Sequence, residues 1–216
     1  MKLIGIAGGS GSGKTTFAMK VMAKLPANKV NLLHMDSYYL HDQPEEFFTK
    51  SGKPNFDHPS SFDWKLLRSH LKTLRDGGSI EVPVYDFSTS MRLEETELLT
   101  PKPILLFEGI FTLFDQTIRE ILDIKTFLHV DADIRFTRRL NRDVQERGRS
   151  LESVTSQYYE TVRPMYQKFL APQQQYADFI VGEETDVAAD ILASKLNDFI
   201  KDEEAIQNLI DHNSFA

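Results

Sequence analysis

Cysteine and long apolar runs are missing from this chain of 216 residues. The absence of cysteine excludes a disulfide framework and a thiolate metal site, and it is typical of a protein in a reducing compartment. The longest apolar tract, PILLFEGIFTLF, is interrupted by Glu108 and is far too short to cross a bilayer. The opening segment MKLIGIAGG offers no small-residue cleavage site for a secretory signal. We therefore expect a cytoplasmic protein that does not associate with membranes.

A surplus of positive charge is missing as well. The chain has 25 lysine and arginine residues against 32 aspartate and glutamate residues, a net charge of −7. This balance argues against a nucleic-acid partner, so an anion site has to come from local placement of basic side chains. A hydrophobic content of 41% is enough for a real core. The composition predicts a single globular α/β domain over residues 1–216.

Short apolar runs alternate with amphipathic stretches along the chain. The runs predict strands at residues 2–7, 29–35, 79–87, 103–110, 124–132 and 177–181. The stretches predict helices at residues 14–25, 63–78, 133–146, 151–169 and 186–201. Residues 36–62 form a long irregular segment, and residues 202–216 are expected to be a helix end and a loose tail. The alternation predicts a three-layer α/β/α fold with a mostly parallel central sheet, whose ligands would gather at the carboxyl ends of the strands.

The segment GGSGSGKT, at residues 8–15, fits the phosphate-binding pattern G-x-x-x-x-G-K-[ST] between a predicted strand and a predicted helix. Glycines let the backbone curl so that several N–H groups point inward, and the helix N-terminus adds positive charge. Lys14 would reach the β- and γ-phosphates, and the Thr15 hydroxyl would ligate Mg²⁺. The pattern predicts a P-loop NTPase. Its expected nucleotide-binding residues are Gly8, Gly9, Ser10, Gly11, Ser12, Gly13, Lys14, Thr15 and Thr16.

The guanine signature of switch GTPases, N-K-x-D, is not present. The nearest match is the run from Asn28 to Asn31, which lacks the final aspartate and precedes the second predicted strand. We therefore expect ATP as the nucleotide, with GTP as an alternative.

Two carboxylates follow buried strands and would meet the nucleotide. Glu108 ends the run ILLFEG and would act on Mg²⁺, through a metal-bound water if not directly. Asp36 follows the second predicted strand, where it could orient an acceptor hydroxyl and take its proton late in the transfer. Each also has a plainer interpretation, since Glu108 could cap a turn and Asp36 could cap a helix. Thr15, Asp36 and Glu108 are the expected metal site.

Six arginines fall within RFTRRLNRDVQERGR, at residues 135–149 of an otherwise acidic protein. Arg135, Arg138, Arg139 and Arg142 recur at helical spacing and would share one stripe of a helix. The plainer interpretation is a solvated amphipathic helix. The functional one is an arginine-rich lid, at about residues 133–150, that closes over a triphosphate and neutralises charge on the transferred group.

Taken together, the motifs resemble those of the uridine-cytidine kinases, in the group that includes phosphoribulokinase and pantothenate kinase. The resemblance spans roughly residues 3–182 and rests on MDSYY, NFDHPSSFD, VPVYDF, LFEGI, RRLNRDVQERGR and SQY in that order. It implies that Asp36 is the catalytic base and that Asp57 grips the ribose hydroxyls. It also implies an aromatic wall at Tyr85 and Phe87 and a substrate contact at Gln157.

The resemblance assigns roles to the arginines and to two insertions. It implies that Arg139 and Arg149 contact the nucleoside, whereas Arg142 and Arg147 face the phosphates. The acceptor would bind between residues 36–62 and residues 79–100. Self-association into a dimer or tetramer is a further implication. Residue by residue, plainer interpretations stay open: Asp57 could form an Asx turn, Tyr85 a half-buried strand end, and Gln157 an ordinary helix surface.

Two positions depart from the family pattern. Ser90 stands where these kinases have the histidine that reads the pyrimidine base, and Asp186 stands where they have an asparagine beside the adenine. A site that loses a specifying hydrogen bond should broaden or change its preference. We expect transfer from ATP with Mg²⁺ to a primary hydroxyl of a small molecule, chiefly the 5′-hydroxyl of uridine or a related nucleoside.

Three alternatives stay open at this stage. One is a kinase of the same group that acts on a sugar, a sugar phosphate or a pantothenate-like substrate. Another is a nucleotide-binding regulator without transfer activity. The third is a nucleic-acid-stimulated ATPase, which the net negative charge disfavours.

Overall fold

The central sheet has five strands, all parallel, in the order β2-β5-β1-β6-β7. The computed structural model describes residues 1–49, 51–87 and 89–213, with side chains up to residue 206. The strands of the sheet are β1 (Lys2–Gly8), β2 (Val30–His34), β5 (Ile104–Gly109), β6 (Ile124–Leu128) and β7 (Phe179–Val181). Every residue of β5 is buried, as expected of a strand covered on both faces.

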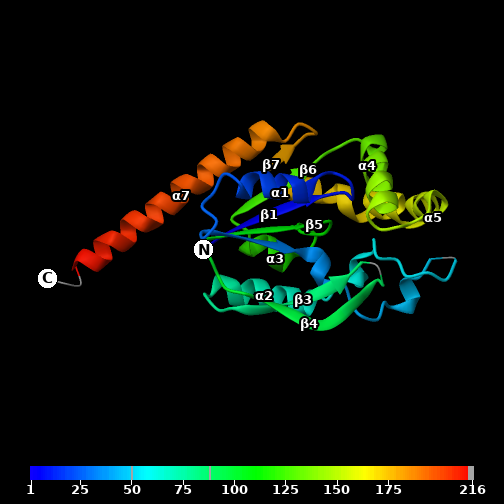
Figure 1. Cartoon of the computed structure of the whole chain (residues 1–216), viewed down its shortest axis with the longest axis horizontal. Helices are drawn as coiled ribbons and strands as arrows, with labels where there is room; N and C mark the ends of the chain where they lie inside the picture. The colour runs from blue at the N-terminus through cyan, green and yellow to red at the C-terminus, as the bar shows by residue number, and fades with distance from the viewer. Residues whose placement is uncertain (50, 88, 214–216) are drawn as a thin grey trace.

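Helices cover both faces of the sheet, which confirms the predicted three-layer architecture (Figure 1). On one face, Ile4 and Ile104 pack against α1 (Lys14–Met22) and α7 (Asp186–Asn213). On the other, Leu3 and Leu105 pack against α2 (Trp64–Arg75) and α3 (Gln116–Ile121). The alternation of successive strand residues between two apolar layers explains why the strands read as continuous apolar runs.

A separate two-stranded sheet pairs β3 (Ile80–Asp86) with β4 (Met91–Leu99) in antiparallel fashion. The first strand was predicted, but the second was not. Its sequence, MRLEETELL, carries charges on both faces and is mostly exposed, so it lacks the apolar run that marks a buried strand. Ser90 sits in the connecting turn with φ of +59°, in the left-handed region.

The helical stretch predicted at 151–169 is longer and less regular than a single α-helix. It begins with α5 (Leu151–Gln157) and continues through two π-helical segments to residue 176. The parts are η4 (Tyr158–Val162), α6 (Arg163–Met165), η5 (Tyr166–Leu170) and η6 (Ala171–Tyr176). Pro164 falls between the two π-segments and cannot donate a backbone hydrogen bond, which accounts for a break in the regular ladder there.

The segment 36–62 is irregular, as predicted, apart from three short 3₁₀ turns. These are η1 (Met35–Tyr38), η2 (Glu45–Phe47) and η3 (Pro59–Ser61). The expected loose tail was wrong over most of its length, because α7 continues to Asn213 and extends past the end of the sheet (Figure 1). Residues 214–216 lie outside the described part of the chain. Within that part, no helix is both long and apolar enough to span a membrane.

Candidate active site

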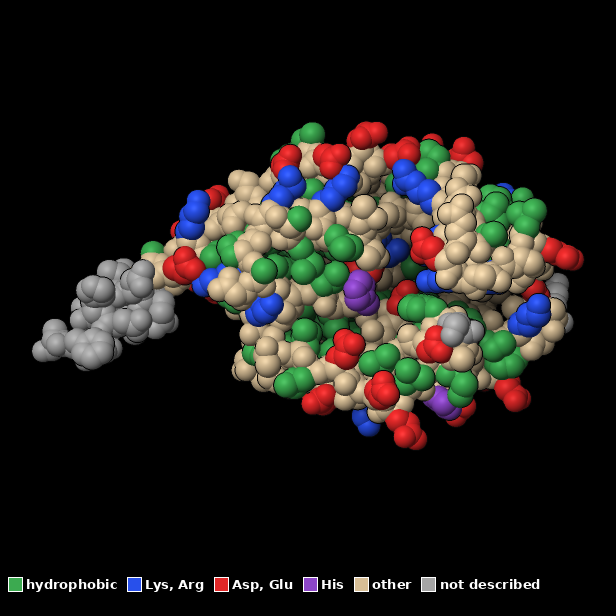
Figure 2. All heavy atoms as spheres, in the orientation of Figure 1, with side chains coloured by type: hydrophobic (Ala, Val, Ile, Leu, Met, Phe, Trp, Pro, Cys, Tyr) green, Lys and Arg blue, Asp and Glu red, His purple; other side chains and the backbone are tan. Residues whose placement is uncertain are grey.

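A cavity of about 780 Å³ opens at the carboxyl ends of the central strands. The P-loop and α4 (Ala132–Gln145) line one side of it. The other is lined by residues of η1, of the β3–β4 hairpin and of the irregular segment, namely Thr49, Lys53, Pro54, Phe56 and Asp57. On the face shown in Figure 2, acidic and basic side chains of the described residues are mixed rather than gathered into a basic patch.

The predicted phosphate loop joins the end of β1 to the start of α1. Gly11 and Gly13 have φ of +78° and +89°, in the left-handed region that glycine tolerates. A Cβ on Gly11 would overlap the backbone carbonyl of Arg135, so glycine is also required there for space. Of the nine loop residues predicted, six line the cavity: Ser10, Gly11, Gly13, Lys14, Thr15 and Thr16.

The other three, Gly8, Gly9 and Ser12, belong to the loop but are absent from the lining. Behind Gly9, the Arg135 guanidinium stacks 3.7 Å from the Tyr166 ring centroid, and its Nε donates to the Val130 carbonyl at 2.9 Å. All four arginines of the predicted stripe lie on α4, but Arg135 packs against the loop and does not line the cavity, whereas Arg138, Arg139 and Arg142 do.

Glu108 lines the cavity and forms hydrogen bonds with two neighbouring side chains. The Thr15 hydroxyl donates to Glu108 Oε1 at 2.8 Å, and His34 Nδ1 lies 2.7 Å from the same oxygen. Burial acts to raise the pKa of Glu108, but the His34 hydrogen bond and the Lys14 charge outweigh it and leave that pKa lowered. Glu108 is therefore ionised.

His34 was missed by sequence reasoning, although a signal existed. β2 pairs with β5 in parallel, and this register sets His34 directly beside Glu108. The hydrogen bond with Glu108 raises the pKa of His34, even though partial burial acts in the opposite direction.

Asp36 lines the same cavity from η1. Burial, followed by the negative charge of Glu108, raises the pKa of Asp36, while Lys14, Arg147 and Arg142 act against the rise. Burial also lowers the pKa of Lys14, and the charges of Glu108 and Asp36 oppose that shift. The three groups feel each other's charge, so the predicted donor loop and the predicted acceptor carboxylate belong to one site. Asp36 lies within η1, whose N-cap is His34, and Glu108 bonds Thr15 and His34, so neither carboxylate occupies the capping position considered for it.

These oxygens could hold a small hard cation. Thr15, Asp36 and Glu108 all border the cavity and supply a hydroxyl and two carboxylates. Within the described residues, no group of three or more His, Cys, Asp or Glu side chains could hold a metal alone. Such a sparse set suits Mg²⁺, which is usually held by one or two carboxylates together with substrate phosphates.

On the opposite side of the cavity, Asp57 is 8% exposed and accepts a hydrogen bond of 2.8 Å from Thr161 Oγ1. Thr161 lies on the π-segment η4, so the helical irregularity places a donor against the irregular loop. Thr161 was not predicted, because nothing in the sequence marks a contact between residues 104 positions apart. The Asx-turn interpretation of Asp57 fails, since it is Asn55 Oδ1 that accepts from the Asp57 N–H.

Aromatic rings line the cavity beside Asp57. The expected pair, Tyr85 and Phe87, lie 5.3 Å apart between centroids and are joined by Tyr39 and Phe56, which were not predicted. Tyr39 lies 5.2 Å from Tyr85 and 5.6 Å from Phe56. Burial raises the pKa of Tyr85 to about 12, with a hydrogen bond to Ser90 acting against the shift.

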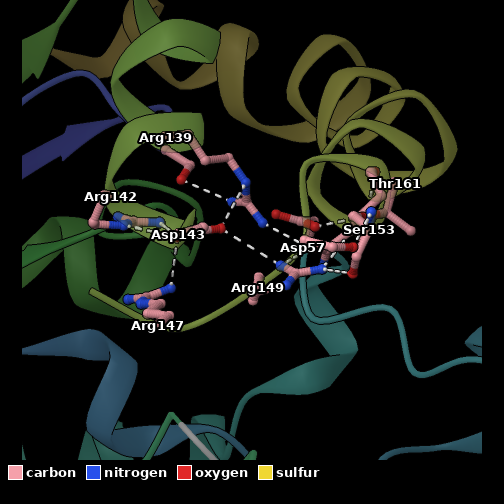
Figure 3. A network of polar contacts seen from close by, with 11 residues as sticks. Asp57, Arg139, Arg142, Asp143, Arg147, Arg149, Ser153 and Thr161 are labelled. Carbon is pink, nitrogen blue, oxygen red and sulfur yellow. Dashed lines mark hydrogen bonds and ion pairs between the residues drawn. The ribbon is translucent and has the colours of Figure 1, made fainter. Parts of the chain in front are cut away.

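The arginines of α4 and the following turn converge on a residue that was not predicted, Asp143, whose side chain is fully buried (Figure 3). Arg139 donates to Ser10 of the phosphate loop at 2.9 Å and to Gln157 at 2.9 Å, and Arg149 donates to the same Gln157 oxygen at 2.6 Å. The solvated-helix interpretation is wrong, because Arg139 is 7% exposed. Predicted residues from both ends of the site are thus brought together.

Arg147 lines the cavity, where its guanidinium lies 4.6 Å from the Phe87 ring centroid and its charge acts on Asp36. Asp186 pairs with Lys20 of α1 at 2.6 Å and is absent from the cavity lining.

A glycine-rich loop between strand and helix, a carboxylate ending the adjacent strand and an arginine-bearing helix over both define a P-loop phosphotransferase. The chain belongs to the phosphoribulokinase / uridine kinase family, whose sequence model matches residues 3–189. It is 45% identical over 204 residues to a uridine kinase of Ligilactobacillus salivarius, covering 94% of this chain and 95% of that one. A uridine kinase of Deinococcus deserti is 45% identical over 196 residues, or 90% and 94% of the two chains.

Solved structures confirm the fold. A possible uridine kinase from Bacillus stearothermophilus superposes with a TM-score of 0.59 at 19% identity, covering 83% of this chain and 87% of that chain. Phosphoribulokinase from Rhodobacter spheroides superposes with a TM-score of 0.59 at 12% identity, covering 84% and 69%.

Proposed function

We propose that the protein transfers the γ-phosphoryl group of ATP to the 5′-hydroxyl of uridine or a closely related nucleoside, with Mg²⁺. The observation that carries this proposal is one cavity lined by Lys14 and Thr15 on its donor side and by Asp36 and Asp57 on its acceptor side. Relatives named uridine kinases, 45% identical over nearly the whole chain, support the acceptor class.

The donor side fits a triphosphate. The loop presents its N–H groups and the N-terminus of α1, and Lys14 adds a charge beside the phosphates. Ser12 Oγ is buried without a hydrogen-bond partner in the described structure, which leaves a polar atom in the cradle unsatisfied when no ligand is bound. Thr15, Asp36 and Glu108 would hold Mg²⁺, which neutralises charge on the β- and γ-phosphates.

The acceptor side fits a nucleoside. Asp57 would accept hydrogen bonds from the ribose hydroxyls, with Thr161 fixing its carboxylate. Tyr39, Phe56, Tyr85 and Phe87 would enclose the base, since they line the cavity next to Asp57. Gln157 and Arg149 border the same space and would complete the substrate contacts.

In the transfer step, the acceptor oxygen bonds to the γ-phosphorus as the bond from that phosphorus to the bridging oxygen breaks. ADP leaves, and the hydroxyl proton passes to the Asp36 carboxylate. The raised pKa of Asp36 makes this carboxylate a better base than an exposed one. Arg142 and Arg147 would balance the charge on the transferred group. We propose that residues 133–150 act as the lid that excludes water from this step.

A sugar or vitamin-precursor kinase of the same family is the second candidate, favoured by Ser90. Its hydroxyl bonds Tyr85 at the turn of the hairpin, and a serine cannot offer an imidazole's contacts to a pyrimidine.

Thermal shift with an unhydrolysable ATP analogue and Mg²⁺, across uridine, cytidine, adenosine, sugar phosphates and pantothenate, tests the proposal because ligands that bind the native state raise Tm. We expect uridine or cytidine to give the largest added shift, and ADP release to follow the same ranking. Shifts from a sugar phosphate alone would establish the second candidate. Nucleotide binding with no turnover on any acceptor would instead indicate a regulator.

A further inference from the structure

The most heavily charged contact in the molecule lies around Asp143, on the inner side of α4. Its carboxylate is fully buried and contacts four guanidinium groups, those of Arg139, Arg142, Arg147 and Arg149. Arg142 makes the closest contacts, with Nε and Nη2 at 2.9 and 2.8 Å from Oδ1. The other three arginines approach at 3.4–3.5 Å (Figure 3).

This cluster holds more positive charge than it can neutralise. Within the described residues, Asp143 is the one carboxylate in ion-pair contact with these four arginines. Their remaining hydrogen-bond partners, Ser10, Gln157 and Ser153, are neutral. Arg139 Nε is buried and makes no hydrogen bond, although it lies 3.5 Å from Asp143 Oδ2. The cluster therefore has donors and charge left over for an anion.

Four like charges this close repel one another and would separate into solvent if nothing held them. Burial lowers the pKa of Arg147, the neighbouring charge of Arg142 adds to that shift, and the negative charge of Asp143 acts against it. One buried carboxylate at the centre offsets the repulsion and sets the direction of each guanidinium. Its loss would leave buried charges without compensation.

We propose that Asp143 is a positioning residue that takes the place of the nucleotide's negative charge while the cavity is empty. It keeps the four arginines gathered, and an incoming triphosphate then completes the neutralisation. Because Arg139 contacts the phosphate loop through Ser10 and shares Gln157 with Arg149, Asp143 also joins the donor and acceptor sides of the site. The expected effect of Asp143 on turnover rests on the proposed function. Its effect on the charge balance of the arginines does not.

The test compares Asp143→Asn with the wild type in inorganic tripolyphosphate, a probe that needs no acceptor and no turnover. Without the anion, we expect Asp143→Asn to have a lower Tm, because the cluster has lost its counter-ion. Saturating tripolyphosphate should then raise its Tm by at least about 3 °C more than it raises the wild type.

Asp115→Asn is the matched control. Asp115 is likewise a carboxylate paired with an arginine, Arg68, at 2.8 Å, but it is 17% exposed and caps α3. Arg68 does not line the cavity, whereas the four arginines around Asp143 do. We expect this variant to have a lower Tm than the wild type as well. Tripolyphosphate should raise its Tm only by as much as it raises the Tm of the wild type. Equal gains for both variants, an unchanged Tm for Asp143→Asn, or failure to fold even with tripolyphosphate present would each overturn the proposal.

Kinetics give a second readout. We expect Asp143→Asn to lower kcat by about tenfold or more, while KM for ATP stays within about threefold or falls, since the site becomes more positive yet less ordered. An unchanged kcat per folded enzyme would overturn the positioning role in catalysis. If the wild type itself phosphorylates no nucleoside, the proposed function fails, and the tripolyphosphate comparison still decides the role of Asp143.

Discussion

The two sides of the cavity are built in different ways. The donor side comes from one contiguous loop and from the ends of neighbouring parallel strands, so its geometry is carried by backbone: Gly11, Gly13 and the start of α1. The acceptor side comes from an irregular segment, a hairpin and a π-helical turn. Its central contact joins Asp57 to Thr161 across 104 positions of sequence. Backbone shape recognises phosphate of any nucleotide, whereas packed side chains select one acceptor.

This difference implies that the two sides can be disturbed separately. Substitutions on the acceptor side should change turnover or acceptor affinity and leave nucleotide binding intact. Asp36 is the most demanding case, because it interacts with Lys14 of the phosphate loop and yet is proposed to serve the acceptor.

Asp36→Asn should have the largest effect. Losing the base should lower kcat about 10²- to 10⁴-fold, while the Tm gain from the ATP analogue stays near that of the wild type. Asp42→Asn, an exposed aspartate of the same segment, should behave as the wild type. Turnover and thermal shift measured on both variants check this. Normal turnover in Asp36→Asn would remove it from the role of base.

Thr161→Val should come next. It removes the hydroxyl that donates to Asp57 but keeps the branched shape, so the buried carboxylate loses a partner. We expect KM for the acceptor to rise about tenfold, in line with a hydrogen bond to a charged group, with KM for ATP unchanged. Thr161→Ser keeps the donor and should retain most of the affinity. If both variants lose ATP affinity as well, the two sides are not separable here.

The same difference explains what could be predicted from sequence. The phosphate loop, Glu108 and the parallel core follow from local patterns, because glycine spacing and apolar runs act over a few residues. Six of the nine loop residues and every other predicted site residue line the cavity.

Residues defined by distant contacts could not be predicted. Thr161 and Tyr39 are ordinary by type, and only the fold brings them to the cavity. Asp143 was hidden among charges that read equally well as a solvated helix. The strand β4 lacks an apolar face, and the continuation of α7 is mostly exposed from residue 201 to residue 206, so no apolar pattern marks it there.

Ser90→His tests the position on the acceptor side where the family pattern has a histidine that reads the base. Placing an imidazole in the hairpin turn should shift preference toward pyrimidine nucleosides by up to about tenfold, the range of one hydrogen bond. The residue has φ of +59°, which histidine and asparagine tolerate better than most. Ser90→Asn therefore controls for the backbone without supplying the ring. The ratio of kcat/KM for uridine and adenosine measures the effect, and an equal ratio in all three proteins would show that base reading lies elsewhere.

The smallest effect should come from a histidine beneath η1. His70 Nδ1 lies 2.9 Å from the Tyr38 hydroxyl, and Tyr38 shares η1 with Asp36. Burial lowers the pKa of His70, with Arg92 acting in the same direction and Asp63 against it. The unfolded chain therefore binds a proton more readily than the folded one, and stability is lost as the pH falls below about 6.5.

We expect the Tm of the wild type to fall between about pH 7 and pH 5.5. In His70→Gln, this fall in Tm should be smaller by on the order of 1 °C. His129 is exposed, and His129→Gln should show the same fall in Tm as the wild type. Because His70 supports the acceptor side, the Tm gain from the ATP analogue should be the same in His70→Gln and the wild type at each pH. A different gain in Tm would mean that a change in η1 alters nucleotide binding at the phosphate loop. The two sides of the cavity would then be coupled through η1, the element that carries Asp36.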